Sequence, residues 1–239
     1  MKEIFRLTAA EIAEGVGAGR MKAVDAVESC LARIAATDRR VDAFTSVLAD
    51  RARARAAGID ARIARGESVG PLAGAPFCVK NLFDVEGIAT LAGSKINSTH
   101  ARASRDAFLV RRMEAAGAIL IGAVNMGEYA YDFTGENVHW GASRNPHDLA
   151  HMSGGSSGGS GAAVAAGMTP LTLGSDTNGS IRVPSSFCGL FGLKPTYGRL
   201  SRAGTFPFVS SLDHLGPIAR SVEDLALAYD AMQGVDADD

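Results

Sequence analysis

The segment GSDTNGSIRVP, residues 174–184, places Ser180 directly behind Asn178 and Gly179. Glycine adopts backbone angles that other residues avoid, so the chain can turn sharply here and expose successive backbone amides. Turns of this kind often hold an anion, and a serine at the end of the turn could react with a group held there. A serine hydroxyl is a weak nucleophile at neutral pH, however, and needs a base beside it.

A second stretch, SGGSSGGSG at residues 153–161, is rich in small residues and leads into the apolar residues 162–166. A flexible linker is the simplest interpretation, but linkers rarely lead straight into an apolar helix. The stretch lacks the Gly-Lys-Ser/Thr ending of a phosphate loop and the G-x-G-x-x-G pattern of a dinucleotide site. Two G-x-S-x-G matches, centred on Ser156 and Ser157, would suit the nucleophile elbow of an α/β-hydrolase. The residues before them, 145–152, are too polar for the buried strand that such an elbow follows.

The elements that must position these serines begin with helices. Thr8 and Glu11 have the spacing of a capping box at a helix start. The alanine- and arginine-rich residues 49–65 end at Gly66, a natural C-terminal cap. The sequence therefore predicts a helical segment over residues 1–66.

The remaining residues, 67–239, are predicted to form an α/β core within a single domain that spans residues 1–239. Short apolar runs alternate there with helical stretches and glycine-rich turns, which is typical of a mixed, mainly parallel sheet flanked by helices. We expect strands at residues 76–79, 119–124, 170–173 and 190–193. We expect helices at residues 108–116, 161–166 and 221–233.

Composition narrows the class of protein. The chain has 239 residues, 46% hydrophobic content and a net charge of −2, so it reads as globular and lacks the basic excess of a nucleic-acid-binding protein. No apolar run is long enough to span a membrane, and the N-terminus carries acids where a signal peptide would be apolar, so we expect no membrane association and a cytoplasmic location. Cys30, Cys78 and Cys188 are few and far apart, which favours core thiols over disulfides or a zinc cluster.

Three segments, in this order, resemble the signature of the amidase signature family. They are APFCVKNLFD at residues 75–84, GGSSGGSGAAVAAG at residues 154–167 and GSDTNGSIRVPSSFCGLFGLKPTYGR at residues 174–199. The resemblance runs through nearly the whole chain. It implies an enzyme that hydrolyses a small-molecule amide with neither a cofactor nor a metal, and it makes residues 67–239 the catalytic core.

On this resemblance Ser180 corresponds to the nucleophile, Ser156 to a bridging serine on a cis peptide, and Lys80 to the base. The chemistry suits these residue types. Lys80 ends the apolar residues 75–79, where burial would lower its pKa and allow the amine to be neutral. Ser156 could pass the proton of Ser180 to Lys80 and later return it to the leaving nitrogen.

The family pattern also implies an oxyanion hole and part of a substrate site. Backbone N–H groups of Thr177, Asn178 and Gly179 would stabilise the oxyanion, each by about 3 kcal/mol. Many members of the family have glycine in place of Asn178, whose side chain could narrow the pocket or touch the substrate. Ala130 and Tyr131 are expected to bind the substrate.

Within the family, several segments are most similar to the carboxybiuret hydrolase subgroup. They are LAGSKIN (residues 91–97), DTNGSIRVP (residues 176–184), LSRAGTFPFV (residues 200–209) and SLDHLGP (residues 211–217). That subgroup cleaves a small carboxylated ureide and pairs with a small helical subunit. The resemblance therefore implies such a substrate, an acyl-enzyme intermediate and a homo- or hetero-oligomer.

Residues 125–148 also resemble the glutamine-using component of the tRNA-dependent amidotransferase, which releases ammonia from glutamine for a partner. This is the alternative function.

A carboxylated substrate would need a cation, for which Arg182 or Arg144 could serve, although a tie between Arg182 and Asp176 is the favoured role of that arginine.

Two further alternatives stay open. His139, His147 and His151 could suggest a metal site, but Pro146 and the polar setting favour surface histidines in a loop. A non-catalytic binding protein or a fragment is the other alternative, because members of the family are commonly about twice this length. The resemblance then covers only the N-terminal portion of the fold, which would be truncated.

Overall fold

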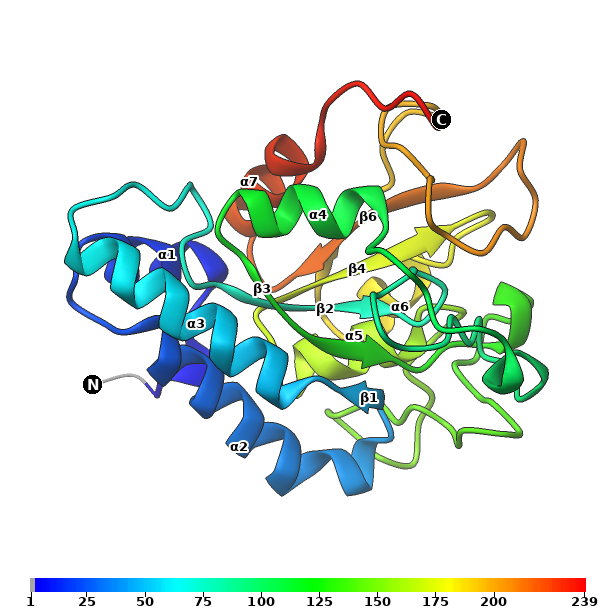
Figure 1. Cartoon of the computed structure of the whole chain (residues 1–239). Coiled ribbons are helices and arrows are strands. Elements are labelled where there is room, and N and C mark those ends of the chain that lie inside the picture. Colours follow the sequence, from blue (N-terminus) through cyan, green and yellow to red (C-terminus); the bar gives the residue numbers. More distant parts are fainter. Residues whose placement is uncertain (1–2) are drawn as a thin grey trace.

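A six-stranded mixed sheet forms the centre of the computed structural model, which describes residues 3–239 (Figure 1). The strands lie in the order β1-β3-β2-β4-β6-β5. Their bounds are Phe44–Val47 (β1), Pro76–Lys80 (β2), Ile119–Val124 (β3), Leu171–Asp176 (β4), Phe191–Gly192 (β5) and His214–Ala219 (β6). The central strands β3, β2 and β4 are parallel, whereas β1, β6 and β5 are added antiparallel. The predicted mixed α/β sheet is confirmed. The expectation that it is mainly parallel is not met, because only the two central pairings of the five are parallel, where helical crossovers join the strands.

Helices flank the sheet and precede it, as predicted (Figure 1). They are α1 (Ala9–Gly17), α2 (Ala23–Val41), α3 (Ala49–Ala64), α4 (Phe108–Ala115), α5 (Gly158–Ala165), α6 (Arg182–Phe187) and α7 (Val222–Met232). The capping box at the start of α1 is present, with Thr8 accepting a hydrogen bond from the Glu11 amide. Single turns of 3-10 helix occur at Ile4–Arg6, Ile96–Thr99 and Glu128–Ala130.

The expectation of a purely helical segment over residues 1–66 is wrong at one place. Strand β1, Phe44–Val47, lies between α2 and α3 and pairs with β3. Its four residues are too few to show the alternation by which a strand is recognised in a sequence. Strand β1 attaches the N-terminal helices to the sheet, and a boundary at residue 66 stays a prediction.

Strand β6 and helix α6 were not expected from the sequence. Strand β6 contains Gly216 and Pro217, and proline cannot donate a hydrogen bond to a neighbouring strand, which argues against a strand at such a position. Here the neighbour on one side is β5, which has two residues, so β6 lies next to the edge of the sheet. Strand β4 also extends beyond the predicted end, to Asp176.

The second part of the glycine- and serine-rich stretch, residues 158–161, begins α5, so the stretch is not a linker. Gly158 and Gly159 are buried in the first turn of α5. A Cβ atom on Gly159 would lie 2.5 Å from the backbone nitrogen of Asn125, so the helix can approach β3 this closely only with glycine there. The small residues thus allow α5 to pack directly against the end of a strand.

All three cysteines, Cys30, Cys78 and Cys188, are buried and free, which confirms the expectation of core thiols. Their burial raises their pKa values, to about 12, 11 and 12, respectively. Over residues 3–239, no helix combines the length and the apolar character that crossing a bilayer requires.

Candidate functional site

The carboxyl ends of two adjacent parallel strands bring the first candidate residues together. Lys80 is the last residue of β2, and Ser175 and Asp176 end β4, which pairs with β2. Polar groups at the carboxyl ends of parallel strands meet at one edge of the sheet, where α/β proteins commonly bind ligands. Two serine-bearing segments, the one before α5 and the one after β4, lie at this edge.

Lys80 is completely buried and binds two serines. Its Nζ atom donates to Ser156 Oγ at 2.6 Å and to Ser175 Oγ at 2.9 Å. The structure therefore joins Lys80 and Ser156, which lie 76 residues apart in the sequence. Ser175 was not singled out from the sequence. It lies five residues before Ser180, in the part of β4 that extends beyond the predicted strand.

Burial lowers the pKa of Lys80 to about 7, because it removes water from the ammonium group. The carboxylates of Asp132, Asp176 and Asp213 act in the opposite direction and favour the charged amine. Around neutral pH, both the neutral and the protonated forms of Lys80 are therefore populated.

The loop that carries Ser156 is held by backbone hydrogen bonds. The Gly155–Ser156 peptide bond is cis, as the resemblance implied. The Gly155 amide donates to the Phe133 carbonyl at 2.9 Å, and the Ser156 carbonyl accepts from the Gly127 amide at 3.1 Å. The next residue, Ser157, donates from its hydroxyl to the Ser175 carbonyl at 3.1 Å, so it ties this loop to β4.

Asp176 organises the turn that leads to Ser180. Arg182 donates from Nε and Nη2 to the two oxygens of Asp176, at 3.0 and 2.9 Å, which confirms the expected tie. Burial favours the protonated carboxyl, but the bonds from Arg182 and from the turn's amides outweigh it and hold the pKa of Asp176 below its usual value. The carboxylate is thus a fixed anion at the base of the turn.

One of the predicted oxyanion-hole amides is already engaged. The Gly179 amide donates to Asp176 Oδ1 at 2.7 Å, so it serves the turn and is not free to bind an oxyanion. Within residues 3–239, the amides of Thr177, Asn178 and Ser180 have no hydrogen-bond partner. The sequence did not distinguish these amides, because the distinction depends on which of them the Asp176 side chain reaches.

Ser180 lines a cavity of about 340 Å³. The other lining residues are Ala130, Tyr131, Asp132, Phe133, Thr177, Asn178 and Phe208. The structure thus brings the two residues expected to bind substrate, Ala130 and Tyr131, beside Ser180. The described residues contain no hydrogen bond between the Ser180 and Ser156 hydroxyls, so the second link of the expected relay is not made in this structure.

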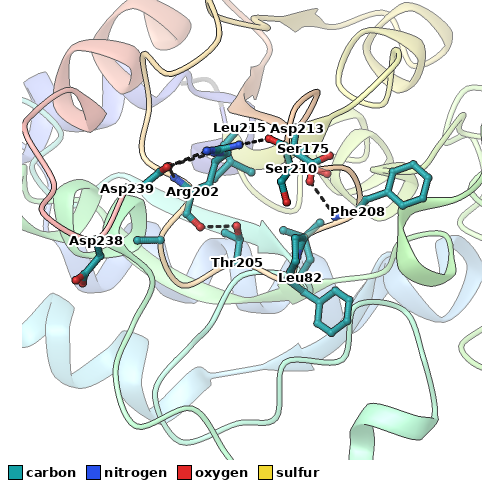
Figure 2. Close-up of a pocket in the computed structure, with 13 residues that line it drawn as sticks. Leu82, Ser175, Arg202, Thr205, Phe208, Ser210, Asp213, Leu215, Asp238 and Asp239 are labelled. Carbon is teal, nitrogen blue, oxygen red and sulfur yellow. Dashed lines mark hydrogen bonds and ion pairs between the residues drawn. The ribbon is translucent and has the colours of Figure 1, made fainter.

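A second cavity, of about 190 Å³, lies on the Ser175 side of the site (Figure 2). Phe208 lines both cavities. In the second cavity, Arg202 is paired with Asp239 at 2.8 Å, and Asp213 accepts from the Phe208 amide at 2.8 Å (Figure 2). Asp213 also accepts from the Thr177 hydroxyl at 2.6 Å and so connects the turn before Ser180 to the loop that carries Phe208.

The histidines considered as metal ligands have separate partners. His139 contacts Glu128, His151 contacts Asp148, and His147 Nε2 lies 3.0 Å from the Cys188 carbonyl. In the part of the chain that the structure describes, no three His, Cys, Asp or Glu side chains are grouped as ligands for a metal ion.

Known proteins are similar to this chain in sequence and in fold. The chain is 65% identical over 226 residues to AtzE, which is named as part of the 1-carboxybiuret hydrolase of Pseudomonas sp. (strain ADP), and the match covers 95% of this chain and 50% of that protein. It is 49% identical over 238 residues to one component of the glutamyl-tRNA(Gln) amidotransferase of Anaeromyxobacter dehalogenans (strain 2CP-C), covering 100% of this chain and 48% of that protein.

Solved structures also match the fold of this chain. One described as "An unexpected vestigial protein complex reveals the evolutionary origins of an s-triazine catabolic enzyme" matches with a TM-score of 0.95 and 63% identity, over 96% of this chain and 50% of that chain. The native peptide amidase of Stenotrophomonas maltophilia matches with a TM-score of 0.92 and 36% identity, over 97% and 49%. This chain therefore spans about half the length of the relatives it matches. A family model described as Amidase matches residues 25–239, and the chain belongs to the amidase signature family.

Proposed function

We propose that this chain forms the catalytic part of an amidase that cleaves a small linear amide or ureide through Ser180, Ser156 and Lys80. The observation that supports it most is the 2.6 Å hydrogen bond between Lys80 and Ser156, made where burial lowers the pKa of the lysine to about 7. An amine with this pKa can accept a proton near neutral pH and give it back. Membership of the amidase signature family supports the same roles.

The reaction would proceed through an acyl-enzyme. Ser180 Oγ attacks the amide carbon and loses its proton to Ser156, whose own proton passes to Lys80. This step requires the Ser180 hydroxyl to turn toward Ser156 when substrate enters. The free amides of Thr177, Asn178 and Ser180 are the candidate donors to the oxyanion, each worth about 3 kcal/mol. The C–N bond then breaks, and the leaving nitrogen takes the proton that returns from Lys80 through Ser156. Water then attacks the acyl-enzyme and loses its proton along the same route, and the acid is released as Ser180 regains its proton.

A carboxylated ureide similar to 1-carboxybiuret is the substrate class we favour, because the relative at 65% identity is named as part of a 1-carboxybiuret hydrolase. A cavity of about 340 Å³ walled by Tyr131, Phe133 and Phe208 suits a small planar molecule. Neither Arg182 nor Arg144 lines this cavity, so the sequence-based idea that one of them binds the substrate carboxylate has no support here.

The alternative is a glutamine-hydrolysing component of an amidotransferase, supported by 49% identity to one component of a glutamyl-tRNA(Gln) amidotransferase. We also propose that a small helical accessory protein binds this chain, since one matching structure is described as a protein complex. Ammonia release from glutamine, measured with and without candidate partner proteins, would separate the alternative from ureide hydrolysis. A cytoplasmic location stays a prediction.

The proposed function is tested by assaying a panel of small amides, ureides and glutamine with the wild type and with Ser180→Ala. We expect ammonia release from one or more ureides and a loss of at least about 10³-fold in kcat/KM for Ser180→Ala. A fluorophosphonate probe should label the wild type and not the variant. An unlabelled wild type that turns over no member of the panel would contradict the proposal.

Arg182→Lys should lower kcat/KM by roughly tenfold for charged and neutral amides alike. Lysine cannot replace the two parallel hydrogen bonds that Arg182 makes to Asp176, so the turn before Ser180 should loosen. Because Arg182 acts on the turn and not on the substrate, the ratio of kcat/KM for carboxylated and neutral amides should stay constant. A selective loss for the carboxylated amides would instead give Arg182 a direct role in substrate binding.

A further inference from the structure

Asp132 is a charged residue of the Ser180 cavity that the reaction described above does not use. Its Oδ1 atom accepts hydrogen bonds from the amides of Thr134 and Gly135, at 2.9 and 3.0 Å. Its Oδ2 atom is buried and has no hydrogen-bond partner among the described residues. An unpaired buried oxygen costs about 1–3 kcal/mol, so its retention calls for a reason other than stability.

The carboxylate of Asp132 fills the space between two backbone segments at the serine loop. A Cβ atom on Gly155 would lie 2.1 Å from Asp132 Oδ1, and one on Gly127 would lie 1.6 Å from Asp132 Oδ2. Gly155 forms the peptide bond to Ser156, and the Gly127 amide donates to the Ser156 carbonyl. Both segments in contact with the carboxylate are therefore attached to the serine that binds Lys80.

Two other carboxylates, Asp176 and Asp213, also favour the charged form of Lys80. Asp176 is neutralised by its two bonds from Arg182. Asp213 accepts from the Thr177 hydroxyl and from backbone amides of the loop that carries Phe208. No lysine, arginine or histidine among residues 3–239 forms an ion pair with Asp132. Its negative charge is thus not cancelled by a neighbouring cation.

We propose that Asp132 is a positioning residue of this site, which holds the Gly155–Ser156 segment in place and whose negative charge stabilises the protonated form of Lys80. A base must hold a proton as well as take one, and an amine buried without a counter-charge would be too weak a base for the relay. Asp132 opposes that effect without forming a salt bridge to Lys80. A salt bridge would instead fix the proton on Lys80 permanently. The idea rests on the proposed role of Lys80 as the base.

The test follows Lys80 directly and does not depend on turnover. The protein is labelled with ¹³Cε-lysine, its NMR signals are titrated with pH, and the Lys80 signal is identified by its loss in Lys80→Met. In Asp132→Asn the side-chain oxygen can still accept from the amides of Thr134 and Gly135, while the charge is removed. We expect the pKa of Lys80 to fall by roughly one unit in this variant.

Asp148→Asn is the matched control. Asp148 Oδ1 accepts from the Ala150 amide at 3.0 Å, two residues along the chain, as Asp132 does from Thr134. Its side chain is exposed and pairs with His151, and it does not act on Lys80. The pKa of Lys80 should therefore be unchanged in this control.

A second variant, Asp132→Ser, guards against an unfolded protein, because its hydroxyl can accept from the Thr134 amide and leaves no polar atom against Gly127. Circular dichroism establishes that each variant is folded. The proposal is overturned if the pKa of Lys80 is the same in folded Asp132→Asn or Asp132→Ser as in the wild type. It is also overturned if both variants unfold, since it requires a fold that survives the loss of charge. A wild-type Lys80 that titrates near 10.5 would instead refute its proposed role as base, whatever the variants do.

Discussion

Lys80→Met should lower kcat/KM by roughly 10³-fold, because it removes the proposed base while filling nearly the same volume. Methionine is apolar and suits the completely buried position, so the protein should remain folded. Ser156 and Ser175 would each lose the hydrogen bond that Lys80 Nζ now donates. The measurement is steady-state hydrolysis of the best ureide from the substrate panel. Lys95→Met, at an exposed lysine, is the control and should leave kcat/KM unchanged.

The pH dependence of kcat/KM in the wild type and in Lys80→Met is a sharper test of the role of Lys80 as the base. In the wild type, only the neutral form of Lys80 can accept a proton, and its pKa is lowered to about 7. Below pH 7, kcat/KM should therefore fall by about tenfold per pH unit, and above pH 7 it should level off. The residual activity of Lys80→Met should lack this acidic limb. If the limb near pH 7 persists without Lys80, another group is the base.

Gly155→Ala is the second large expected effect, on activity and on stability together. The new methyl group would lie 2.1 Å from Asp132 Oδ1 and 2.7 Å from the Gly135 nitrogen, so the serine loop must move. A displacement of about 1 Å at a catalytic group can cost roughly 10²-fold in rate, and overpacking typically costs about 1–3 kcal/mol. We expect losses of that size in kcat/KM and in the free energy of unfolding measured in urea.

Gly58→Ala is the matched control for this change. Gly58 lies in α3, and a Cβ atom there would meet no heavy atom within 4 Å. Alanine has the higher helix propensity, so the free energy of unfolding should rise by up to about 1 kcal/mol and kcat/KM should not change. Equal behaviour of the two alanine variants would mean that the loop at Gly155 tolerates a side chain and that the contact with Asp132 is not tight.

Much of the fold could be predicted from local pattern. Strand β3 begins and ends at the expected residues, and β2 exceeds the expected range by Lys80 alone, because a buried central strand appears in the sequence as an apolar run bounded by turn signals. Strands β1 and β6 were not predicted because neither shows a clear strand pattern. Strand β1 has only four residues, and β6 contains Gly216 and Pro217.

The candidate site was also predicted only in part. The resemblance of three segments to the amidase signature family indicated Lys80 and Ser156, and the structure joins these two residues through a hydrogen bond. Ser175 could not be recognised, because its contact with Lys80 depends on the register between two parallel strands. Asp213 lies 36 residues from Thr177, to which it is bonded, and no local pattern connects them. The engagement of the Gly179 amide by Asp176 likewise depends on the conformation of one side chain.

The burial of all three cysteines bears on how this protein reacts with electrophiles. With pKa values raised to about 11 or 12, Cys30, Cys78 and Cys188 carry almost no thiolate at neutral pH. Thiolate is the form of cysteine that attacks carbon, phosphorus or disulfide centres, and these sulfur atoms are also shielded from solvent. The native protein should therefore form no adducts at cysteine, and alkylation of a cysteine sulfur would signal that the chain had opened.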